Sequence, residues 1–307
     1  NLIKKYYKVA IITDENVYKI YKEKINIKGL DILIVKPGEK SKSFTVKNSL
    51  DEKLLEKKFN RNSLIIGFGG GVVGDLSGYV AATILRGIDL VHIPTSLIAI
   101  VDSSIGGKTG INSKNGKNLI GSFYNPREIL INSEFIKTLS LKEIRQGLSE
   151  IIKYGVIKNE KIFNFLEKSN KVFMQNHKKN IDKIIKECIK IKIDTVEKDF
   201  KENDLRSILN FGHTIGHALE KKYSYKFSHG DCIGTGMAIE SLIANNIYKL
   251  STKNFSRILK LLDRFELRKV SYKANDIENL LDLMELDKKN KNSMITFSLP
   301  KKIGSML

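Results

Sequence analysis

The chain has 307 residues, and its 41% hydrophobic content is enough for two domains with a core each, which excludes a disordered or fibrous protein. The formal net charge is +19, but only eight of the 53 basic residues are arginine, and the lysines are spread over nearly every segment. Because base-reading and phosphate-forking sites favour arginine, we expect no nucleic-acid partner and infer that the charge helps to capture small anions.

Hydropathy and cysteine content predict where the protein works. No apolar stretch approaches the roughly 18 residues of a membrane-spanning helix, and the opening residues do not resemble a secretory signal. The two cysteines, Cys188 and Cys232, suit neither a disulfide framework nor a zinc motif, which is typical of a reducing compartment. We therefore expect a soluble, cytoplasmic protein that does not bind a membrane.

Alternating strands and helices are predicted for the first half of the chain. Short β-branched or apolar runs are separated by stretches with helical spacing, and the last of these runs ends at Pro94. We expect strands at residues 7–12, 31–35, 63–68 and 90–93, and helices at residues 17–25 and 72–85. This order is typical of a mostly parallel sheet, which binds ligands at the carboxyl ends of its strands.

From about residue 139 the pattern changes to long segments with the 3.6-residue period of a helix. These segments are residues 141–158, 179–196, 205–221, 234–248 and 254–265. The predicted fold class is therefore an N-terminal parallel-sheet α/β domain, residues 1–138, followed by an all-helical domain, residues 139–307. The cleft between two such domains is the expected place for an active site.

Two glycine-rich segments are candidates for anion binding. Residues 69–74 satisfy G-x-G-x-x-G between a predicted strand and a predicted helix, where backbone N–H groups can receive a pyrophosphate. Asp89 comes too early in the chain to be the acid of a dinucleotide-binding fingerprint. The alternative interpretation, a tight strand-to-helix turn that binds no ligand, therefore remains. Residues 102–110 contain Gly-Lys-Thr at positions 107–109 but have Asp102 where a P-loop has its first glycine. This leaves two possibilities, an anion-binding loop or a solvated basic loop.

Two groups of polar residues in the second half suit a metal. His213 and His217 are four residues apart on one helical face, so their spacing favours both as ligands, and hydrogen bonds to nearby carbonyls are the alternative. The segment between them lacks the glutamate of a zinc protease. Glu150 precedes Lys153 by three residues, and the isoleucines between them indicate a buried pair rather than the usual surface ion pair. A buried carboxylate needs a cation or a metal.

These segments together resemble the 3-dehydroquinate synthase family. The residues that carry the resemblance are 69–78, 93–97, 102–112, 116–121, 150–155, 210–213, 229–230 and 287–290. They follow the family's order over nearly the whole chain and are therefore more specific than any one glycine loop. Residues 139–143 lack the family's usual proline, and Asp231 replaces a frequent glutamate, which affects local geometry more than chemistry.

The resemblance implies an NAD-binding domain, a second domain with one divalent metal, usually zinc and alternatively cobalt, and a homodimer. The family's metal ligands correspond to Glu150, His213 and His229, and His217 would face the substrate phosphate instead of the metal. Contacts to NAD are implied for Asp14, Asn16, Glu39, Lys42, Gly70, Gly71, Val72, Asp75, Thr95, Ser96 and Lys117. Contacts to the substrate are implied for Asp102, Lys108, Asn118, Lys153, Lys192, Arg206, Asn210, His217 and one of Lys288 or Lys289, with Arg86 reaching the substrate phosphate from a partner subunit.

The activity implied by the resemblance is that of a phosphate lyase in the shikimate pathway. The family converts 3-deoxy-arabino-heptulosonate 7-phosphate to 3-dehydroquinate and phosphate through transient NAD-dependent oxidation, β-elimination, re-reduction and intramolecular aldol closure. The basic residues suit this anionic sugar phosphate. The alternatives are a related sugar phosphate cyclase and a glycerol-dehydrogenase-like alcohol dehydrogenase with a metal and NAD, although the dehydrogenase has no need for so many anion-binding lysines.

Overall fold

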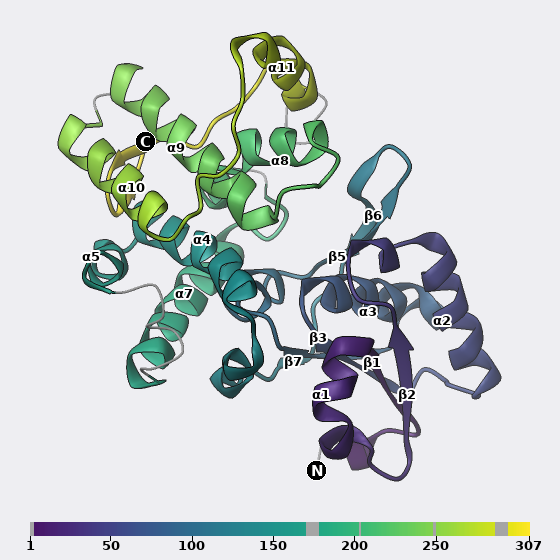
Figure 1. Cartoon of the computed structure of the whole chain (residues 1–307). Coiled ribbons are helices and arrows are strands. Elements are labelled where there is room, and N and C mark those ends of the chain that lie inside the picture. The colour runs from purple at the N-terminus through teal and green to yellow at the C-terminus, as the bar shows by residue number, and fades with distance from the viewer. Residues whose placement is uncertain (1–2, 170–177, 203, 248–249, 286–293) are drawn as a thin grey trace. The chain divides into compact units, whose positions relative to one another are not determined.

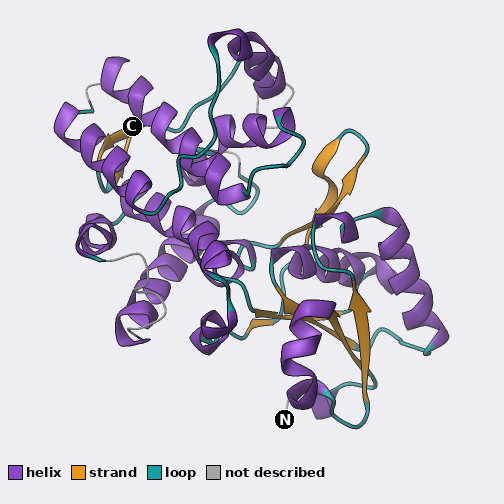
Figure 2. Ribbon diagram, in the orientation of Figure 1, coloured by secondary structure: helices purple, strands orange, loops and turns teal. Residues whose placement is uncertain are grey.

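The computed structural model describes residues 3–169, 178–202, 204–247, 250–285 and 294–307 (Figure 1). The chain divides into two compact units, Asn1–Thr138 and Leu139–Leu307. Figure 2 shows strands between helices in the first unit and mostly helices in the second. The predicted α/β fold class with a helical C-terminal part is confirmed.

A five-stranded parallel sheet forms the centre of the first unit. Its order is β2-β1-β3-β4-β7, with β1 at Val9–Asp14, β2 at Leu30–Val35, β3 at Leu64–Gly69, β4 at Asp89–Pro94 and β7 at Glu128–Ile129. Val9 pairs in register with both Leu30 and Leu64, so the first three strands start level and their carboxyl ends lie along one edge. This edge is where parallel α/β sheets bind ligands.

Successive side chains of a strand point to opposite faces, and helices cover the inner strands of this sheet on both faces. The covering helices are α1 at Glu15–Ile25, α2 at Phe44–Glu56 and α3 at Gly71–Thr83. Ala10 and Ile12 of β1 pack with side chains of α2 and α3 on one face, and Val9 and Ile11 pack with α1 on the other. The helices therefore hold the strand ends in place.

A two-stranded antiparallel hairpin follows, with β5 at Lys108–Ser113 and β6 at Gly116–Phe123. The sequence pattern suggests only glycine-rich turns here. Gly110 pairs with Gly121, and a Cβ on Gly121 would lie 2.0 Å from the carbonyl oxygen of Thr109. These glycines therefore allow the two strands to approach, and they do not mark a loop.

Helix α4, Leu141–Ile157, is buried over most of its length. Every residue from 147 to 157 is buried, as expected of a helix that is covered on all sides. The other elements of this unit are α5 at Glu160–Lys168, α7 at Lys178–Lys198, α8 at His213–Lys222, α9 at His229–Ile247, α10 at Thr252–Arg264, α11 at Ile277–Glu285, β8 at Pro300–Lys302 and β9 at Ser305–Met306. The backbone N–H of Gly304, between β8 and β9, donates to the carbonyl oxygen of Val156 at 2.7 Å. The unit is therefore not all-helical, because a short hairpin closes the end of α4.

The prediction of one continuous helix at residues 205–221 is wrong, because the helix is interrupted near its centre. The chain forms a 3₁₀ turn at Leu205–Asn210 and then α8, with Gly212 between them at φ +79°. Glycine adopts this left-handed conformation without strain, and such a residue interrupts a helix. His213 therefore lies at the start of a helix and not in the middle of one.

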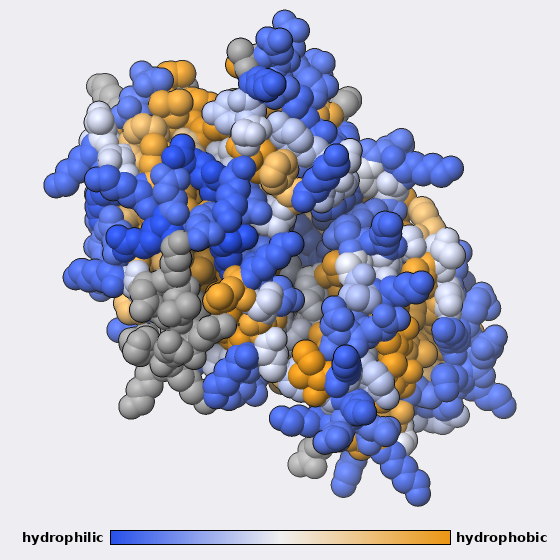
Figure 3. All heavy atoms as spheres, in the orientation of Figure 1, coloured by the Kyte–Doolittle hydropathy of each residue, from blue (hydrophilic) through white to orange (hydrophobic). Residues whose placement is uncertain are grey.

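None of the described helices is both long and apolar enough to span a membrane. On the face drawn in Figure 3, hydrophilic residues surround smaller groups of apolar ones. Scattered exposed apolar residues of this kind are ordinary on a protein surface.

Candidate functional site

A buried ion pair lies on α4. Glu150 and Lys153 are each 1% exposed, and Nζ of Lys153 contacts Oε2 of Glu150. The expectation of a buried pair rather than a surface pair is confirmed. Beyond this contact, neither oxygen of Glu150 accepts a hydrogen bond from a described residue, although buried carboxylates normally do. The carboxylate is therefore able to take a further cationic partner.

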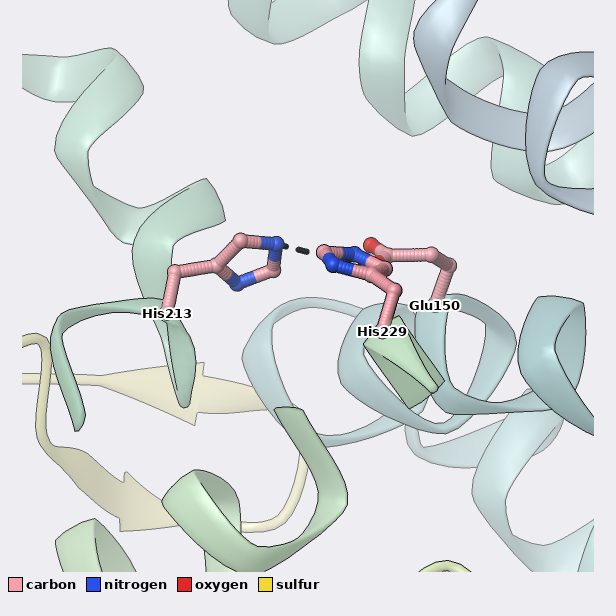
Figure 4. A group of neighbouring side chains, drawn as sticks. All are labelled: Glu150, His213 and His229. Carbon is pink, nitrogen blue, oxygen red and sulfur yellow. Dashed lines mark ion pairs between the residues drawn. The ribbon is translucent and has the colours of Figure 1, made fainter. Parts of the chain in front are cut away.

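Two histidines from separate helices point at this carboxylate (Figure 4). Nε2 of His213, at the start of α8, lies 3.4 Å from Oε1 of Glu150, and Nε2 of His229, at the start of α9, lies 3.4 Å from the same atom. Helix α9 approaches α4 closely because Gly230 has no side chain: a Cβ there would lie 2.7 Å from Cα of Gln146. Three helices thus bring three potential ligands together.

The three groups fit a divalent metal. A tetrahedral zinc ion with bonds of about 2.0–2.1 Å holds its ligand atoms roughly 3.3 Å apart, close to the spacing of the Nε2 and Oε1 atoms. Ligand atoms of Glu150, His213 and His229 all lie within 4.8 Å of one another. Two imidazoles and a carboxylate are the donors of many catalytic zinc sites that keep a position open. These three residues could therefore hold one ion.

A second group of possible ligands shares one histidine with the first. His217, Glu220 and His229 also have ligand atoms within 4.8 Å of one another. Among the described residues, no group of this kind contains both His213 and His217, whose ring centroids are 5.4 Å apart. The pairing favoured by their spacing is therefore not supported. Glu220 was not predicted, although it follows His213 by seven residues and so shares its helical face.

Burial and neighbouring charges shift the pKa values of the cluster's side chains in opposite directions. Burial raises the pKa of Glu150, but Lys153 and His213 outweigh this effect and hold that pKa well below its usual range. Burial, together with the Lys153 charge, lowers the pKa of His213 to about 3. Burial also acts to lower the pKa of His229, but Glu220 and Glu150 outweigh it and raise that pKa to about 10. His213 is therefore a neutral imidazole, whereas His229 would release a proton on binding a metal.

Three of the other residues implied for the substrate lie on elements packed against α4. Lys192 is on α7, and Arg206 and Asn210 are in the 3₁₀ turn that precedes α8; both elements contact α4. Lys192 and Arg206 are buried. Lys288 and Lys289 lie outside the described residues. Contact of these residues with a substrate stays a prediction.

The first glycine-rich segment lies between the carboxyl end of β3 and the start of α3. Gly70 is the N-terminal cap of α3, and the carbonyl oxygen of Gly69 accepts a hydrogen bond from the backbone N–H of Thr95 at 2.9 Å. A pocket here is lined by five glycines of residues 67–74 together with His92, Pro94, Ala99, Ser103 and Ser104. The first N–H groups of a helix have no partner within the helix, so this end of α3 can receive a phosphate.

His92 of β4 also lines this pocket. It is a polar residue that belongs to none of the sequence motifs described above. It is 5% exposed, and its Nδ1 has no hydrogen bond with a described residue. Burial lowers the pKa of His92 to about 4. The imidazole is therefore neutral at physiological pH.

A buried lysine connects several of the residues implied for NAD. Nζ of Lys42 lies 2.6 Å from Oδ2 of Asp75 and 3.5 Å from Oε1 of Glu39, and it also contacts Oδ1 of Asn118. Burial acts to lower the pKa of Lys42, but Asp75 and Glu39 outweigh it and raise that pKa. Asn112, which was not predicted, donates to Oε1 of Glu39 at 2.9 Å. The network joins three residues implied for NAD to Asn118, which is implied for the substrate.

The remaining implied residues of the first unit lie in its turns and its hairpin. Asp14 accepts a hydrogen bond from the backbone N–H of Asn16 at 2.9 Å and caps α1. Arg86 is exposed and has a φ of +65°. The others are Gly71 and Val72 in the first turn of α3, Ser96 after β4, Asp102 in the π-helical turn Ala99–Ser103, Lys108 on β5 and Lys117 on β6. Their contacts with NAD or substrate also stay predictions.

Two family models together cover most of the chain. The model of the 3-dehydroquinate synthase N-terminal domain matches residues 32–146, and the model of the C-terminal domain matches residues 147–290. The 3-dehydroquinate synthase of Dictyoglomus thermophilum is 44% identical over 300 residues, which are 96% of this chain and 83% of the relative. That of Caldanaerobacter subterraneus is 41% identical over 100% of this chain and 88% of the relative.

Solved structures share the fold. The 2-epi-5-epi-valiolone synthase of Streptomyces hygroscopicus, with NAD⁺ and Zn²⁺ bound, has a TM-score of 0.91 at 22% identity, covering 100% of this chain and 88% of that one. A 2-deoxy-scyllo-inosose synthase complexed with carbaglucose-6-phosphate, NAD⁺ and Co²⁺ has a TM-score of 0.87 at 25% identity, covering 99% and 85%. The glycerol dehydrogenase of Schizosaccharomyces pombe is less similar, with a TM-score of 0.67 at 16% identity, covering 98% and 83%. Since both family models and the sequence relatives agree, the chain belongs to the 3-dehydroquinate synthase family.

Proposed function

We propose that this chain converts 3-deoxy-arabino-heptulosonate 7-phosphate to 3-dehydroquinate and phosphate, a step of aromatic amino acid biosynthesis. The observation that carries the proposal is the cluster of Glu150, His213 and His229 beside the buried Lys153, in a chain 44% and 41% identical to two relatives named 3-dehydroquinate synthase. A carboxylate and two imidazoles suit the oxidation of an alcohol at a metal, and lysines suit a sugar phosphate.

We propose Glu150, His213 and His229 as the ligands of one divalent ion, zinc or cobalt. An ion bound there supplies a Lewis acid that lowers the pKa of a substrate alcohol. Lys153, against Oε2 of Glu150, can pair with a substrate anion or hydroxyl, since its ammonium is buried and needs anionic neighbours. His217 can donate to the substrate phosphate. Relatives with bound Zn²⁺ or Co²⁺ support a metal of this kind.

We propose the carboxyl edge of the parallel sheet as the NAD site. Gly70, Gly71 and Val72 offer backbone N–H groups to the pyrophosphate at the start of α3. The Lys42 network orients Asp75 and Glu39, and the remaining contacts come from Asp14, Asn16, Thr95, Ser96 and Lys117. NAD held by these residues would supply a hydride acceptor that is regenerated within each cycle.

The residues proposed to contact the substrate are Asp102, Lys108, Asn118, Lys153, Lys192, Arg206, Asn210, His217 and one of Lys288 or Lys289. We also propose a cytoplasmic homodimer, in which Arg86 reaches the substrate phosphate of the other subunit. The exposure of Arg86 supports its contact with the other subunit's substrate. The two cysteines, which are buried as free thiols, support the cytoplasmic location.

Phosphate release from the heptulosonate phosphate tests the proposed function. NAD⁺ at a small fraction of the substrate concentration should support many turnovers without accumulation of NADH, because the hydride is returned within each cycle. Stoichiometric NADH with glycerol, and no release of phosphate, would instead identify an alcohol dehydrogenase.

A further inference from the structure

The two histidines of the cluster are held differently on the side away from Glu150. Nδ1 of His213 lies 3.1 Å from the carbonyl oxygen of Phe211, whereas Nδ1 of His229 lies 3.3 Å from Oε1 of Glu220. A neutral imidazole carries one N–H, so a ring that donates through Nδ1 presents the lone pair of Nε2. Both rings therefore face Glu150 as metal ligands would, but one is held by a neutral carbonyl and the other by a carboxylate.

Close packing of two helices puts Glu220 in this position. Helix α8 ends with Lys222, and Glu220 lies in its last turn, 6% exposed. Glycines let α8 and α9 approach: a Cβ on Gly236 would lie 2.1 Å from the carbonyl oxygen of Gly212, and one on Gly216 would lie 3.1 Å from Cα of Ile233. A carboxylate carried by α8 is therefore held beside the first residue of α9, His229.

We propose that Glu220 is a positioning residue of the metal site, which accepts the Nδ1 proton of His229, orients Nε2 toward the ion and remains outside the coordination shell. This inference rests on the proposed metal site. A carboxylate behind a ligating histidine fixes the tautomer and makes the ring a stronger donor. The charge of Glu220 is in turn compensated by the ring and the ion, which a buried carboxylate requires.

The other possible arrangement has Glu220 itself as a ligand, together with His217 and His229. It would require Nδ1 of His229 to bind the ion and so to lose its hydrogen bond to Glu220. It would also leave Glu150, which is 1% exposed and accepts no hydrogen bond from a described residue, without a metal. The geometry therefore favours Glu150 as the ligand and Glu220 as its support.

Zinc affinity, measured by competition with a chromogenic chelator, tests the proposal without an activity assay. Relative to the wild type, we expect Glu220→Gln to bind zinc about tenfold more weakly and Glu220→Ala up to about a hundredfold more weakly, the range typical of such supporting residues. Glu187→Gln is the matched control, because Glu187 accepts a hydrogen bond from Asn159 at 3.0 Å in the same unit and should leave the affinity unchanged. Wild-type affinity in both Glu220 variants would overturn the proposal.

The absorption spectrum of the cobalt-loaded protein separates a supporting residue from a ligand. Glu220→Gln should keep the d–d bands of the wild type, since the ligand set is unchanged. A change in coordination number in this variant would identify Glu220 as a ligand and overturn the inference. If Glu150→Gln kept full zinc affinity, the proposed metal site itself would fail, which is a different result.

The zinc-loaded wild-type protein provides a test that needs no substitution at position 220. With ¹⁵N-labelled histidine, His229 should show a protonated Nδ1 that exchanges slowly with water and a Nε2 bound to metal. A protonated Nε2, or a metal-bound Nδ1, would contradict the proposal even if every variant failed to fold.

Discussion

Lys153 gives the proposed metal cluster a positive neighbour that is not itself one of the proposed ligands. Its Nζ contacts Oε2 of Glu150, and the ring centroid of Tyr154 lies 5.2 Å from Nζ. An ammonium buried this deeply is stable only beside an anion or a strong acceptor. If a metal shares the charge of Glu150 as proposed, we expect a substrate anion to be the second partner of Lys153.

Lys153→Met is therefore expected to lower kcat/KM about a hundredfold, on the order of 2–3 kcal/mol for a lost charge-assisted contact. Zinc content should not fall, because the ammonium does not ligate. Steady-state kinetics and elemental analysis check both parts. Near-normal activity would show that Lys153 serves only to neutralise Glu150.

A paired substitution separates the roles of two histidines on one helical face. His213→Ala should lose bound metal and turnover, because the coordination shell is then incomplete. His217→Ala should keep its metal but bind the phosphate-bearing substrate poorly. Elemental analysis and substrate titration measure these outcomes, and loss of metal in His217→Ala would refute the assignment.

His92 makes the stability of the first unit depend on pH. The ring stays neutral in the folded chain down to a pH of about 4, whereas an unfolded histidine binds a proton below about 6.5. The unfolded state thus binds more protons between these values, and stability is lost as the pH falls through this window, by about 2–3 kcal/mol for this group at pH 4.5.

His92→Gln should remove this contribution. Urea unfolding of wild type and variant at pH 7 and pH 4.5 gives the comparison, in which the wild type should lose more stability on acidification. Equal losses in the two proteins would mean that the ring is hydrogen-bonded or hydrated in solution.

The local pattern of apolar residues predicts most of the helices and strands. It fails where the backbone turns sharply or where two segments of backbone approach each other closely. The first four strands of the chain match their predicted ranges to within two residues, because apolar runs between turns have few alternatives. The helix predicted at residues 205–221 is broken by Gly212. Gly110 and Gly121 pair in a hairpin, although the sequence pattern predicts loops at both glycines. A glycine needed for contact between elements cannot be told from a glycine needed for a turn until the partner is known.

The glycines of α9 allow a test at the level of the helix. A Cβ on Gly230 would lie 2.7 Å from Cα of Gln146 on α4, and a Cβ on Gly234 would lie 2.2 Å from the carbonyl oxygen of Leu267. Each glycine-to-alanine variant should destabilise the protein by about 1–3 kcal/mol, the usual cost of overpacking. The Gly230 variant should in addition weaken zinc binding, since the clash separates the start of α9 from the helix that carries Glu150.

Gly234→Ala is the matched control, because its clash lies one turn further along the same helix and away from α4. Thermal unfolding and chelator competition measure the two effects. An equal loss of zinc affinity in both variants would mean that general destabilisation, and not the position of His229, accounts for it.

The proposed metal cluster joins residues that lie far apart in the chain, which sets a limit on sequence reasoning. Glu150 precedes His213 by 63 residues, and only the packing of α4, α8 and α9 brings them together. Spacing alone favours His213 with His217, because it detects a shared helical face and nothing beyond one helix. The isoleucines beside Glu150 predicted a buried carboxylate suited to a metal, and the family resemblance supplied His229 as its partner, whereas Glu220 and His92 belong to no motif and emerge only from contacts and burial.

The net charge of +19 should affect how the whole protein meets its substrate. A strongly positive protein attracts a multiply charged anion at long range, and salt screens this attraction over about 10 Å at 0.1 M. We expect KM for the sugar phosphate to rise several-fold between low and high salt, with kcat changing much less. An unchanged KM would mean that local contacts alone capture the substrate.

The hydrogen bond from Gly304 to Val156 means that α4 can be fully covered only after residues near the end of the given sequence have been synthesised. The strands of the first unit are complete once Ile129 has been made, so that unit can fold while the ribosome is still producing the second, as domains generally do. Helix α4 is made next, but the hairpin that closes its end comes from residues 300–306. Until then the helix that carries Glu150 lacks part of its cover, and its apolar surface is open to chaperones and proteases. A polypeptide released before Gly304 is therefore one that cellular quality control can recognise and remove.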